Sequence, residues 1–322
     1  MLASMKNGIS RRDSMALMAS VGLLPCQPCV ASHDDTDRPA RLSSAVTFDL
    51  GGQDDDKPWQ ITLYIPPGPA PKDGWPVLYL LDGNAVTATA IDIERVQASY
   101  PEATGITSRF VIVGVGYPAS DAYDTVRRCW DYTPPPGRTY PSFEPGGPAV
   151  RTGGAPAFLD FVLNALKPAI ERRCPVHRAK QALFGHSFGG LFTLYALANA
   201  PTAFSHWIAA SPSIYWEDRT ILKIIDKTDS TVKGNSHVLI MVGAYEEKPA
   251  PPAAQNREQE DDQAHPEATQ MISLARALAT RLDQRQGLKS RFQIIPRRTH
   301  MAVLPDALNE TVAFFLGNEA DR

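Results

Sequence analysis

The sequence predicts an α/β fold in which a mainly parallel sheet carries helices on both faces. Short apolar runs begin near residues 77, 111, 182, 207, 238 and 292, and segments with the apolar spacing of helices separate them. This alternation is typical of parallel strands joined by helical crossovers. The runs are almost continuously apolar, as expected for strands buried on both faces.

Two strands are expected before the alternation begins. Residues 45–50 and 59–65 are strand-like in composition, and the short polar segment 51–58 between them favours an antiparallel pair. Two later segments interrupt the alternation: residues 132–154 are rich in Pro and Gly, and residues 246–266 are rich in Pro, Gln and acidic residues. Both follow predicted strand ends, so we expect them to form the rim of an open cleft; insertions without a role are the alternative.

The stretch Gly185-His186-Ser187-Phe188-Gly189 has the pattern G-x-S-x-G. It follows an apolar run and precedes a helical pattern, so strand, turn and helix occur in the order of a nucleophile elbow rather than of an ordinary glycine-rich turn. Such a turn strains the backbone of its serine, and we expect both glycines to be needed because a Cβ would clash there. Ser187 is the predicted nucleophile.

A serine nucleophile needs a base that accepts its proton. His300 lies in a loop after the strand-like run at 292 and before the helical pattern 307–316, where an α/β sheet of this type places its base. His237 opens a strand, where a structural role is more common, and His265 lies in a polar loop. We therefore predict His300 as the base.

An acid must orient the base. The apolar run 238–242 is followed shortly by Glu246 and Glu247, which places two carboxylates beyond the carboxyl end of a strand, where α/β sheets collect functional groups. Glu246 is the first choice and Glu247 the second. The carboxylates at 260–262 belong to a charged run, whose default interpretation is a solvated loop.

Acyl transfer also requires hydrogen-bond donors for the oxyanion. The backbone N–H of Phe188, directly after the serine, is one candidate. The second should come from the turn after the strand-like run at 77, so we predict the backbone N–H of Gly83 or Asn84. Gly83 would let the main chain approach a substrate closely. An ordinary strand-ending turn is the alternative.

Five motifs in this order resemble the esterase-D-type branch of the α/β-hydrolases, most closely its enterobactin and salmochelin trilactone esterases. They are Tyr79-Leu80-Leu81-Asp82-Gly83-Asn84, Val113-Gly114-Val115-Gly116-Tyr117-Pro118, Arg127-Arg128-Cys129-Trp130-Asp131-Tyr132-Thr133-Pro134, Gly185-His186-Ser187-Phe188-Gly189-Gly190-Leu191-Phe192 and Ser211-Pro212-Ser213-Ile214-Tyr215-Trp216. The resemblance runs from about residue 46 to the C-terminus. The same motifs are similar to those of feruloyl esterases, S-formylglutathione hydrolases and mycolyltransferases.

The resemblance implies an α/β-hydrolase fold and a single catalytic domain over residues 33–322. It also implies hydrolysis of the ester bonds of a catecholate trilactone siderophore in its ferric form, with iron as part of the substrate and no cofactor. The alternative activity is hydrolysis of another acyl group, such as a feruloyl or acetyl ester or an S-formylglutathione-like thioester. A siderophore-binding module without catalysis is a third reading, which the presence of Ser187, His300 and a carboxylate after a strand disfavours.

A ferric tris-catecholate is anionic and carries flat rings, so its site should offer guanidinium groups and aromatic walls. Arg127 and Arg128 are the predicted cationic contacts, although one of them could instead hold its loop through an internal ion pair. Tyr215 and Trp216, which follow the strand-like run at 207, are the predicted aromatic walls. A packing role is the alternative for Trp216.

Residues 1–32 have the layout of an export signal. The pair Arg11-Arg12 precedes the apolar run 15–24, and small residues follow at 30–32. The arginine pair resembles a twin-arginine signal, with Sec export as the alternative. The run is too short for a permanent membrane anchor. We therefore expect the export machinery to be a partner, cleavage near residue 32 and a periplasmic location.

Composition excludes several other functions. The net charge of −3 gives no broad basic surface, so nucleic acid is not an expected partner. The cysteines and histidines have no zinc-site spacing, and no metal site is predicted. Beyond the export signal only Cys129 and Cys174 remain, and they could form a disulfide or stay as free buried thiols.

Overall fold

The computed structural model describes residues 42, 44–51, 57–142, 145–228, 231–247 and 270–317. The predicted export signal 1–32, the carboxylates at 260–262 and His265 lie outside the described residues. The predicted rim segment 246–266 does so for the most part.

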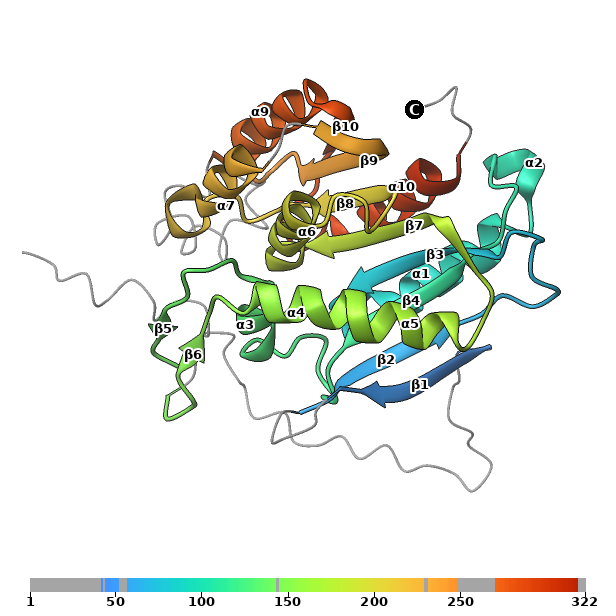
Figure 1. Cartoon of the computed structure of the whole chain (residues 1–322), viewed down its shortest axis with the longest axis horizontal. Helices are drawn as coiled ribbons and strands as arrows, with labels where there is room; N and C mark the ends of the chain where they lie inside the picture. Colours follow the sequence, from blue (N-terminus) through green and yellow to red (C-terminus); the bar gives the residue numbers. More distant parts are fainter. Residues whose placement is uncertain are drawn as a thin grey trace, which may run out of the picture.

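Eight strands form one sheet in the order β1-β2-β4-β3-β7-β8-β9-β10 (Figure 1). Their bounds are β1 Ala45–Leu50, β2 Trp59–Tyr64, β3 Trp75–Leu81, β4 Val111–Gly116, β7 Val176–His186, β8 His206–Ala210, β9 Thr231–Gly243 and β10 Gln286–Ile295. The helices are α1 Gly83–Gln97, α2 Pro101–Thr104, α3 Arg127–Tyr132, α4 Ala155–Phe161, α5 Lys167–Glu171, α6 Phe188–Asn199, α7 Trp216–Lys227, α9 Met271–Asp283 and α10 Leu304–Leu316, and a π-helical stretch Val162–Leu166 joins α4 to α5.

The sheet confirms the predicted mixture of strand directions. β1 pairs antiparallel with β2 from Ala45 opposite Tyr64 to Leu50 opposite Trp59, and β2 pairs antiparallel with β4. The remaining neighbours, from β4 across to β10, all pair in parallel. This is the mainly parallel α/β sheet with an antiparallel start that the sequence predicts.

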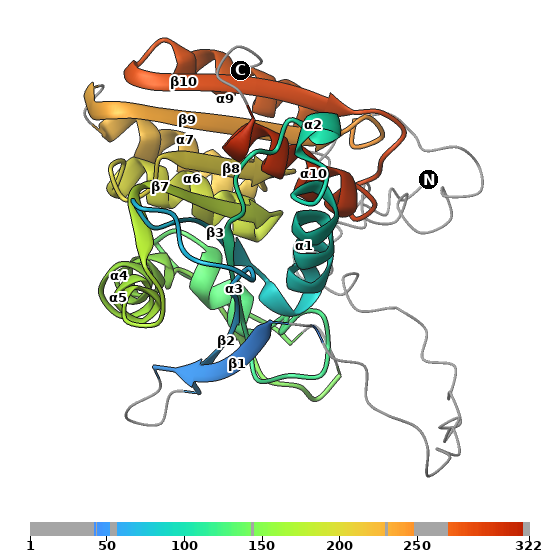
Figure 2. The ribbon, with the colours of Figure 1, turned by 90° about the vertical axis from the view of Figure 1, so that its right-hand side faces the viewer.

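Two hydrophobic cores lie on opposite faces of the sheet, because side chains alternate along each strand. On β3, Tyr79 and Leu81 belong to the core on the side of α4 to α6, whereas Leu78 and Leu80 belong to the core under α1 and α10. Figure 2 shows these two groups of helices on the two sides of the sheet. The strands appear as continuous apolar runs in the sequence because both of their faces are buried in a core.

The described parts of the Pro- and Gly-rich segment, residues 132–142 and 145–154, contain regular structure that its composition does not suggest. It contains a small antiparallel hairpin, β5 (Thr139–Tyr140) with β6 (Val150–Arg151), which is separate from the main sheet. Thr152 closes the hairpin, since its Oγ accepts a hydrogen bond from the Arg138 N–H at 2.8 Å. Composition predicts a loop here, and the structure adds a folded rim element.

The direction of the chain along the sheet reverses beside β3. From β3 the chain first continues to β4 on one side and then crosses to β7 on the other. In open α/β sheets such a reversal creates a crevice outside the carboxyl ends of the strands, and ligands bind there. β3 ends before Asp82 and β7 ends before Ser187, so both predicted catalytic turns follow the carboxyl ends of the strands at this reversal.

Cys129 and Cys174 are both buried free thiols. Of the two alternatives from the sequence, a disulfide or free thiols, the structure shows the free thiols.

Among the helices of the described residues, none has the length and apolar character needed to span a membrane.

Asp131 of α3 is a buried carboxylate that ties α3 to the sheet. Its Oδ2 accepts hydrogen bonds from Trp59 Nε1 at 2.8 Å and from the Tyr117 hydroxyl at 3.0 Å. Burial raises the pKa of Asp131 to about 6, against the opposing effects of these two hydrogen bonds and of the Arg127 charge. The folded protein therefore holds this proton more tightly than the unfolded chain does.

This difference predicts a pH dependence of stability. The stability that the protonated Asp131 contributes is fully present below about pH 4 and is lost as the pH rises through about 6. The loss amounts to about 2 to 3 kcal/mol in the free energy of unfolding. Asp131→Asn should remove that loss, so the variant should gain stability relative to wild type between pH 4 and 7. Urea unfolding at several pH values measures it, with the exposed Asp160→Asn as control; a constant difference between Asp131→Asn and wild type would contradict the assignment.

Candidate active site

Ser187 occupies a strained turn between β7 and α6. Its φ of 58° and ψ of −118° fall where residues other than glycine rarely lie. A Cβ on Gly185 would lie 2.1 Å from the carbonyl oxygen of Gly189, so glycine is required at 185 as predicted. The same expectation is wrong for Gly189, because a Cβ there would meet its nearest atoms at 3.5 Å, an ordinary contact.

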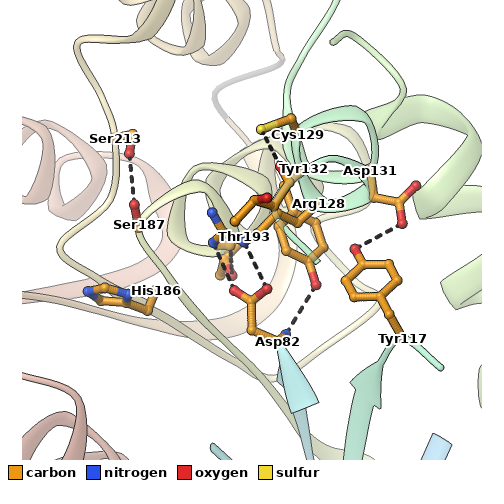
Figure 3. A network of polar contacts seen from close by, with 12 residues as sticks. Asp82, Tyr117, Arg128, Cys129, Asp131, Tyr132, His186, Ser187, Thr193 and Ser213 are labelled. Atoms are coloured by element: carbon orange, nitrogen blue, oxygen red, sulfur yellow. Dashed lines mark hydrogen bonds and ion pairs between the residues drawn. The ribbon is translucent and has the colours of Figure 1, made fainter. Parts of the chain in front are cut away.

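The serine turn is held against the end of β8. The Ser187 N–H donates to the Ala210 carbonyl at 3.0 Å, and the Ser213 N–H donates to the Ser187 carbonyl at 3.2 Å. The Ser187 hydroxyl lies 3.4 Å from the Ser213 hydroxyl (Figure 3). Ser187 itself is only partly buried, so its hydroxyl can be reached by a substrate.

The structure brings His300 and Glu246 together. Nδ1 of His300 lies 2.9 Å from Glu246 Oε2, while the other carboxylate oxygen accepts hydrogen bonds from the Ser211 hydroxyl at 2.6 Å and the Gly243 N–H at 2.5 Å. The Glu246 side chain is 2% exposed and the His300 side chain 33% exposed. A buried, fully bonded carboxylate thus fixes an imidazole that remains open to the site.

The other candidates lie elsewhere. Glu247 accepts a hydrogen bond from Ser273 of α9, so the geometry favours Glu246 over Glu247 as the partner of His300. His237 is partly buried; it stacks on His206 at 4.9 Å between ring centroids and contacts Phe314 of α10. The structural reading of His237 is therefore confirmed.

His186 contacts the His300 loop, which the sequence analysis did not predict. Its Nε2 lies 2.7 Å from the His300 carbonyl oxygen, and the two rings are 4.7 Å apart. Burial, followed by the charge of His300, lowers the pKa of His186 well below its ordinary value. His186 is therefore neutral and donates its Nε2 proton to the carbonyl, which ties the His300 loop to the residue before Ser187. The variable x of G-x-S-x-G gave no signal for this role.

Two serines after β8 were also overlooked. Ser211 donates to the buried oxygen of Glu246, and Ser213 faces Ser187. Their position directly beyond the carboxyl end of a strand is the signal that could have identified them.

The predicted oxyanion turn lies at the start of α1. Asp82, which precedes it, has a left-handed conformation with φ 53° and ψ 48°. A Cβ on Gly83 would lie 2.7 Å from the backbone of Gly114, so close packing on β4 explains this glycine directly. The side-chain amide of Asn84 donates to the carbonyls of Tyr117 and Ala119 at 3.0 and 3.1 Å. These contacts fix the turn.

The proposed donors belong to two helix N-termini. Gly83 and Asn84 begin α1, and Phe188 begins α6. The first N–H groups of an α-helix have no acceptor within the helix, and the helix dipole favours negative charge beside them. Since β3 and β7 are adjacent in the sheet, the two helices begin beyond the carboxyl ends of neighbouring strands.

The two predicted cationic contacts make internal interactions. Arg127 donates to the backbone carbonyls of Lys57 and Pro58 at 2.7 and 2.9 Å. Arg128 forms a bidentate ion pair with Asp82, with both distances 2.9 Å, and its side chain is 11% exposed. Burial would lower the pKa of Arg128, but the charge and hydrogen bonds of Asp82 raise it above the ordinary value. Of the two alternatives that the sequence left open, a substrate contact or an internal ion pair, Arg128 forms the internal ion pair.

The predicted aromatic walls stand at the start of α7. Tyr215 and Trp216 are partly buried, and Trp216 packs edge-on against Phe188 at 4.7 Å. The next residue, Glu217, accepts a hydrogen bond from Tyr140 of the hairpin and an ion pair from Arg138 at 3.2 Å. Trp216 is therefore a packed side chain that also borders the residue after Ser187.

The assembled groups have the parts needed for acyl transfer. An accessible hydroxyl lies on a strained turn, an imidazole is fixed by a buried carboxylate, and two helices begin beyond the carboxyl ends of adjacent strands. The nucleophile turn and the imidazole loop are joined through His186. Among the residues that the structure describes, no cluster of metal-ligating side chains is present.

Comparisons with known proteins agree with this chemistry. The profile of a family described as "Putative esterase" matches residues 55–293. The chain is 33% identical over 273 residues to the ferri-bacillibactin esterase BesA of Bacillus subtilis, covering 83% of this chain and 88% of the relative. It is 36% identical over 195 residues to a siderophore enterobactin esterase of Emericella nidulans, covering 58% of this chain and 63% of that protein. The crystal structure of the BES protein from Bacillus cereus superposes with a TM-score of 0.71 at 30% identity, covering 88% of this chain and 99% of that one.

The contact between His300 and Glu246 predicts a graded loss of activity. We expect His300→Ala to lower kcat by about 10⁶-fold, because it removes the base, and Glu246→Ala to lower it by about 10⁴-fold, because the base remains but loses its orientation. Hydrolysis of p-nitrophenyl acetate measures both. Ser273→Ala, which frees only Glu247, is the control and should retain wild-type kcat. A larger loss in Glu247→Ala than in Glu246→Ala would transfer the acid role to Glu247.

Proposed function

This chain belongs to the Putative esterase family, and from that premise we propose that it hydrolyses the ester bonds of a ferric catecholate trilactone siderophore, of the enterobactin or salmochelin type. The observation that carries the catalytic part is the buried Glu246 that fixes His300 beside the Ser187 turn. The relatives named for ferri-bacillibactin and enterobactin support the substrate class.

In the proposed mechanism the Ser187 hydroxyl attacks a carbonyl carbon of the trilactone ring while His300 accepts its proton. Glu246 holds the imidazole in the required tautomer and stabilises the imidazolium. The N–H groups of Phe188 and of Gly83 or Asn84 receive the oxyanion. His300 then protonates the leaving alkoxide of the substrate. A water molecule activated by the same base hydrolyses the acyl-enzyme and frees Ser187.

The hairpin rim offers cationic groups for an anionic substrate. Arg138 is 65% exposed although it pairs with Glu217, and Arg151 is exposed on the paired strand. Arg127 and Arg128 make internal contacts, and the Arg151 guanidinium lies over the Trp130 ring at 4.4 Å. The exposed Arg138, paired with Glu217 beside Trp216, is therefore the arginine best placed to meet a bulky anion. A guanidinium group suits both the negative charge and the flat rings of catechols.

We also propose that residues 1–32 direct export and that the reaction takes place in the periplasm. The replacement of both Arg11 and Arg12 by Lys should abolish twin-arginine export. Cell fractionation and the mass of the mature N-terminus measure this. Periplasmic protein from the doubly substituted chain would point to Sec export instead, and unprocessed cytoplasmic wild-type protein would reject the location.

A product assay tests the substrate. Purified enzyme and Ser187→Ala are incubated with ferric and iron-free enterobactin, with an ester-linked hydroxamate siderophore and with p-nitrophenyl acetate, and products are identified by liquid chromatography and mass spectrometry. We expect linear trimer, dimer or monomer from enterobactin in wild type alone, while Ser187→Ala still binds the ferric siderophore. Cleavage of the simple ester only would leave a general carboxylesterase, and cleavage of the hydroxamate alone would change the siderophore class.

A further inference from the structure

The oxyanion site is formed by two separate elements whose spacing must be fixed. The candidate donors are the N–H of Phe188 at the start of α6 and the N–H of Gly83 or Asn84 at the start of α1. An oxyanion is stabilised only when both donors are within hydrogen-bond distance of one atom, and a displacement of about 1 Å can cost about a hundredfold in rate. Some contact must therefore hold one turn against the other.

Asp82 is the residue whose conformation sets the α1 turn. It has the left-handed φ of 53°, which is uncommon outside glycine although Asp tolerates it better than most residues, so contacts that reinforce it help to fix the turn. Its N–H donates to the Tyr132 hydroxyl at 3.1 Å, and its carboxylate accepts two hydrogen bonds from Arg128. Both contacts come from α3, which is outside the sheet (Figure 3).

The same ion pair reaches the other turn. The Arg128 guanidinium lies 5.7 Å from the ring centroid of Phe188. Asp82 Oδ2 lies 3.5 Å from the point where a Cβ on Gly189 would stand, so the carboxylate borders the first turn of α6. With side-chain exposures of 11% for Arg128 and 3% for Asp82, the pair is buried, and it contacts the first turn of α6 while Asp82 itself precedes α1.

We propose that Arg128 is a positioning residue for the oxyanion site, acting through its bidentate ion pair with Asp82. The guanidinium fork holds Asp82 in its left-handed conformation and packs against Phe188, so one side chain sets the distance between the donors on α1 and α6. A lysine cannot replace it, because an ammonium group lacks the planar fork that bonds both carboxylate oxygens. The inference rests on the proposed role of Ser187 and concerns the rate of acyl transfer, not the choice of siderophore.

The chain contains a matched control for this ion pair. Arg109 binds Glu94 in the same bidentate manner, with distances of 2.9 and 2.8 Å, and the Glu94 side chain is fully buried. Glu94 lies near the C-terminal end of α1, whereas Asp82 lies just before its N-terminus. Arg109→Lys therefore perturbs the same kind of contact at the opposite end of the same helix.

The test compares Arg128→Lys, Asp82→Asn and Arg109→Lys with wild type, using p-nitrophenyl acetate, a neutral substrate that needs no cationic contact. We expect both site variants to lower kcat by about 10- to 100-fold with KM within about threefold, and to slow inactivation by diisopropyl fluorophosphate in proportion. Arg109→Lys should lower the melting temperature while it keeps kcat within about twofold.

The outcomes separate the alternatives. Equal losses of kcat in Arg128→Lys, Asp82→Asn and Arg109→Lys would reduce the pair to a general stabilising contact and overturn the proposal. Unchanged kcat for the neutral ester with a raised KM for ferric enterobactin would make Arg128 a substrate contact instead. Should Arg128→Lys fail to fold, Asp82→Asn, which is nearly isosteric, decides alone. Wild-type protein that does not hydrolyse the neutral ester and does not react with the fluorophosphate would refute the role of Ser187 itself.

Discussion

The end of β8 is the point on which the arrangement of the site depends. Through Ala210 it accepts the N–H of Ser187, and through the Ser211 hydroxyl it fixes Glu246. The Ser211 N–H in turn donates to Met241 of β9 at 2.7 Å. The nucleophile turn, the acid and the strand that carries the acid are thus joined by short hydrogen bonds at one residue pair. At the buried carboxyl end of a central strand, water competes little for these hydrogen bonds. They therefore strongly oppose small displacements of the nucleophile turn and of Glu246.

The parallel sheet explains why distant parts of the sequence meet there. Asp82, Ser187, Ser211, Glu246 and His300 all follow the carboxyl ends of strands, and these ends share one edge. The strands are clamped between two hydrophobic cores, which leaves little freedom in their relative positions. The residues that follow the carboxyl ends of the strands are therefore held at fixed distances from one another. Helix α3 adds contacts to them from outside the sheet.

Local patterns in the sequence predicted most of this. The strands, the serine turn and the His300 loop follow from apolar runs, glycine spacing and order along the chain. The chain alone left Glu246 and Glu247 open, because adjacent carboxylates differ only in which side of the turn they face. The contact of His186 was not predictable, because any residue can stand at that position of G-x-S-x-G. The sequence left the ion pair of Arg128 without a partner, because no pattern places α3 against the turn after β3. For Gly189 the prediction was wrong in the opposite way. The rule that both glycines of the serine turn exclude a Cβ was applied to a position where a Cβ would fit.

The hairpin of β5 and β6 has a different relation to the catalytic groups. It lies outside the main sheet and reaches Trp216 through Tyr140, whereas Ser187, His300 and Glu246 are held by strand ends. Residues 217–219, where the hairpin docks, have positive φ angles and follow the wall residue directly. The wall residue Trp216 is thus linked both to an element outside the main sheet and to Phe188 beside the nucleophile. A change in the hairpin would therefore alter the packing of Trp216 through Tyr140 and Glu217, while the strand ends that hold Ser187, His300 and Glu246 stay in place.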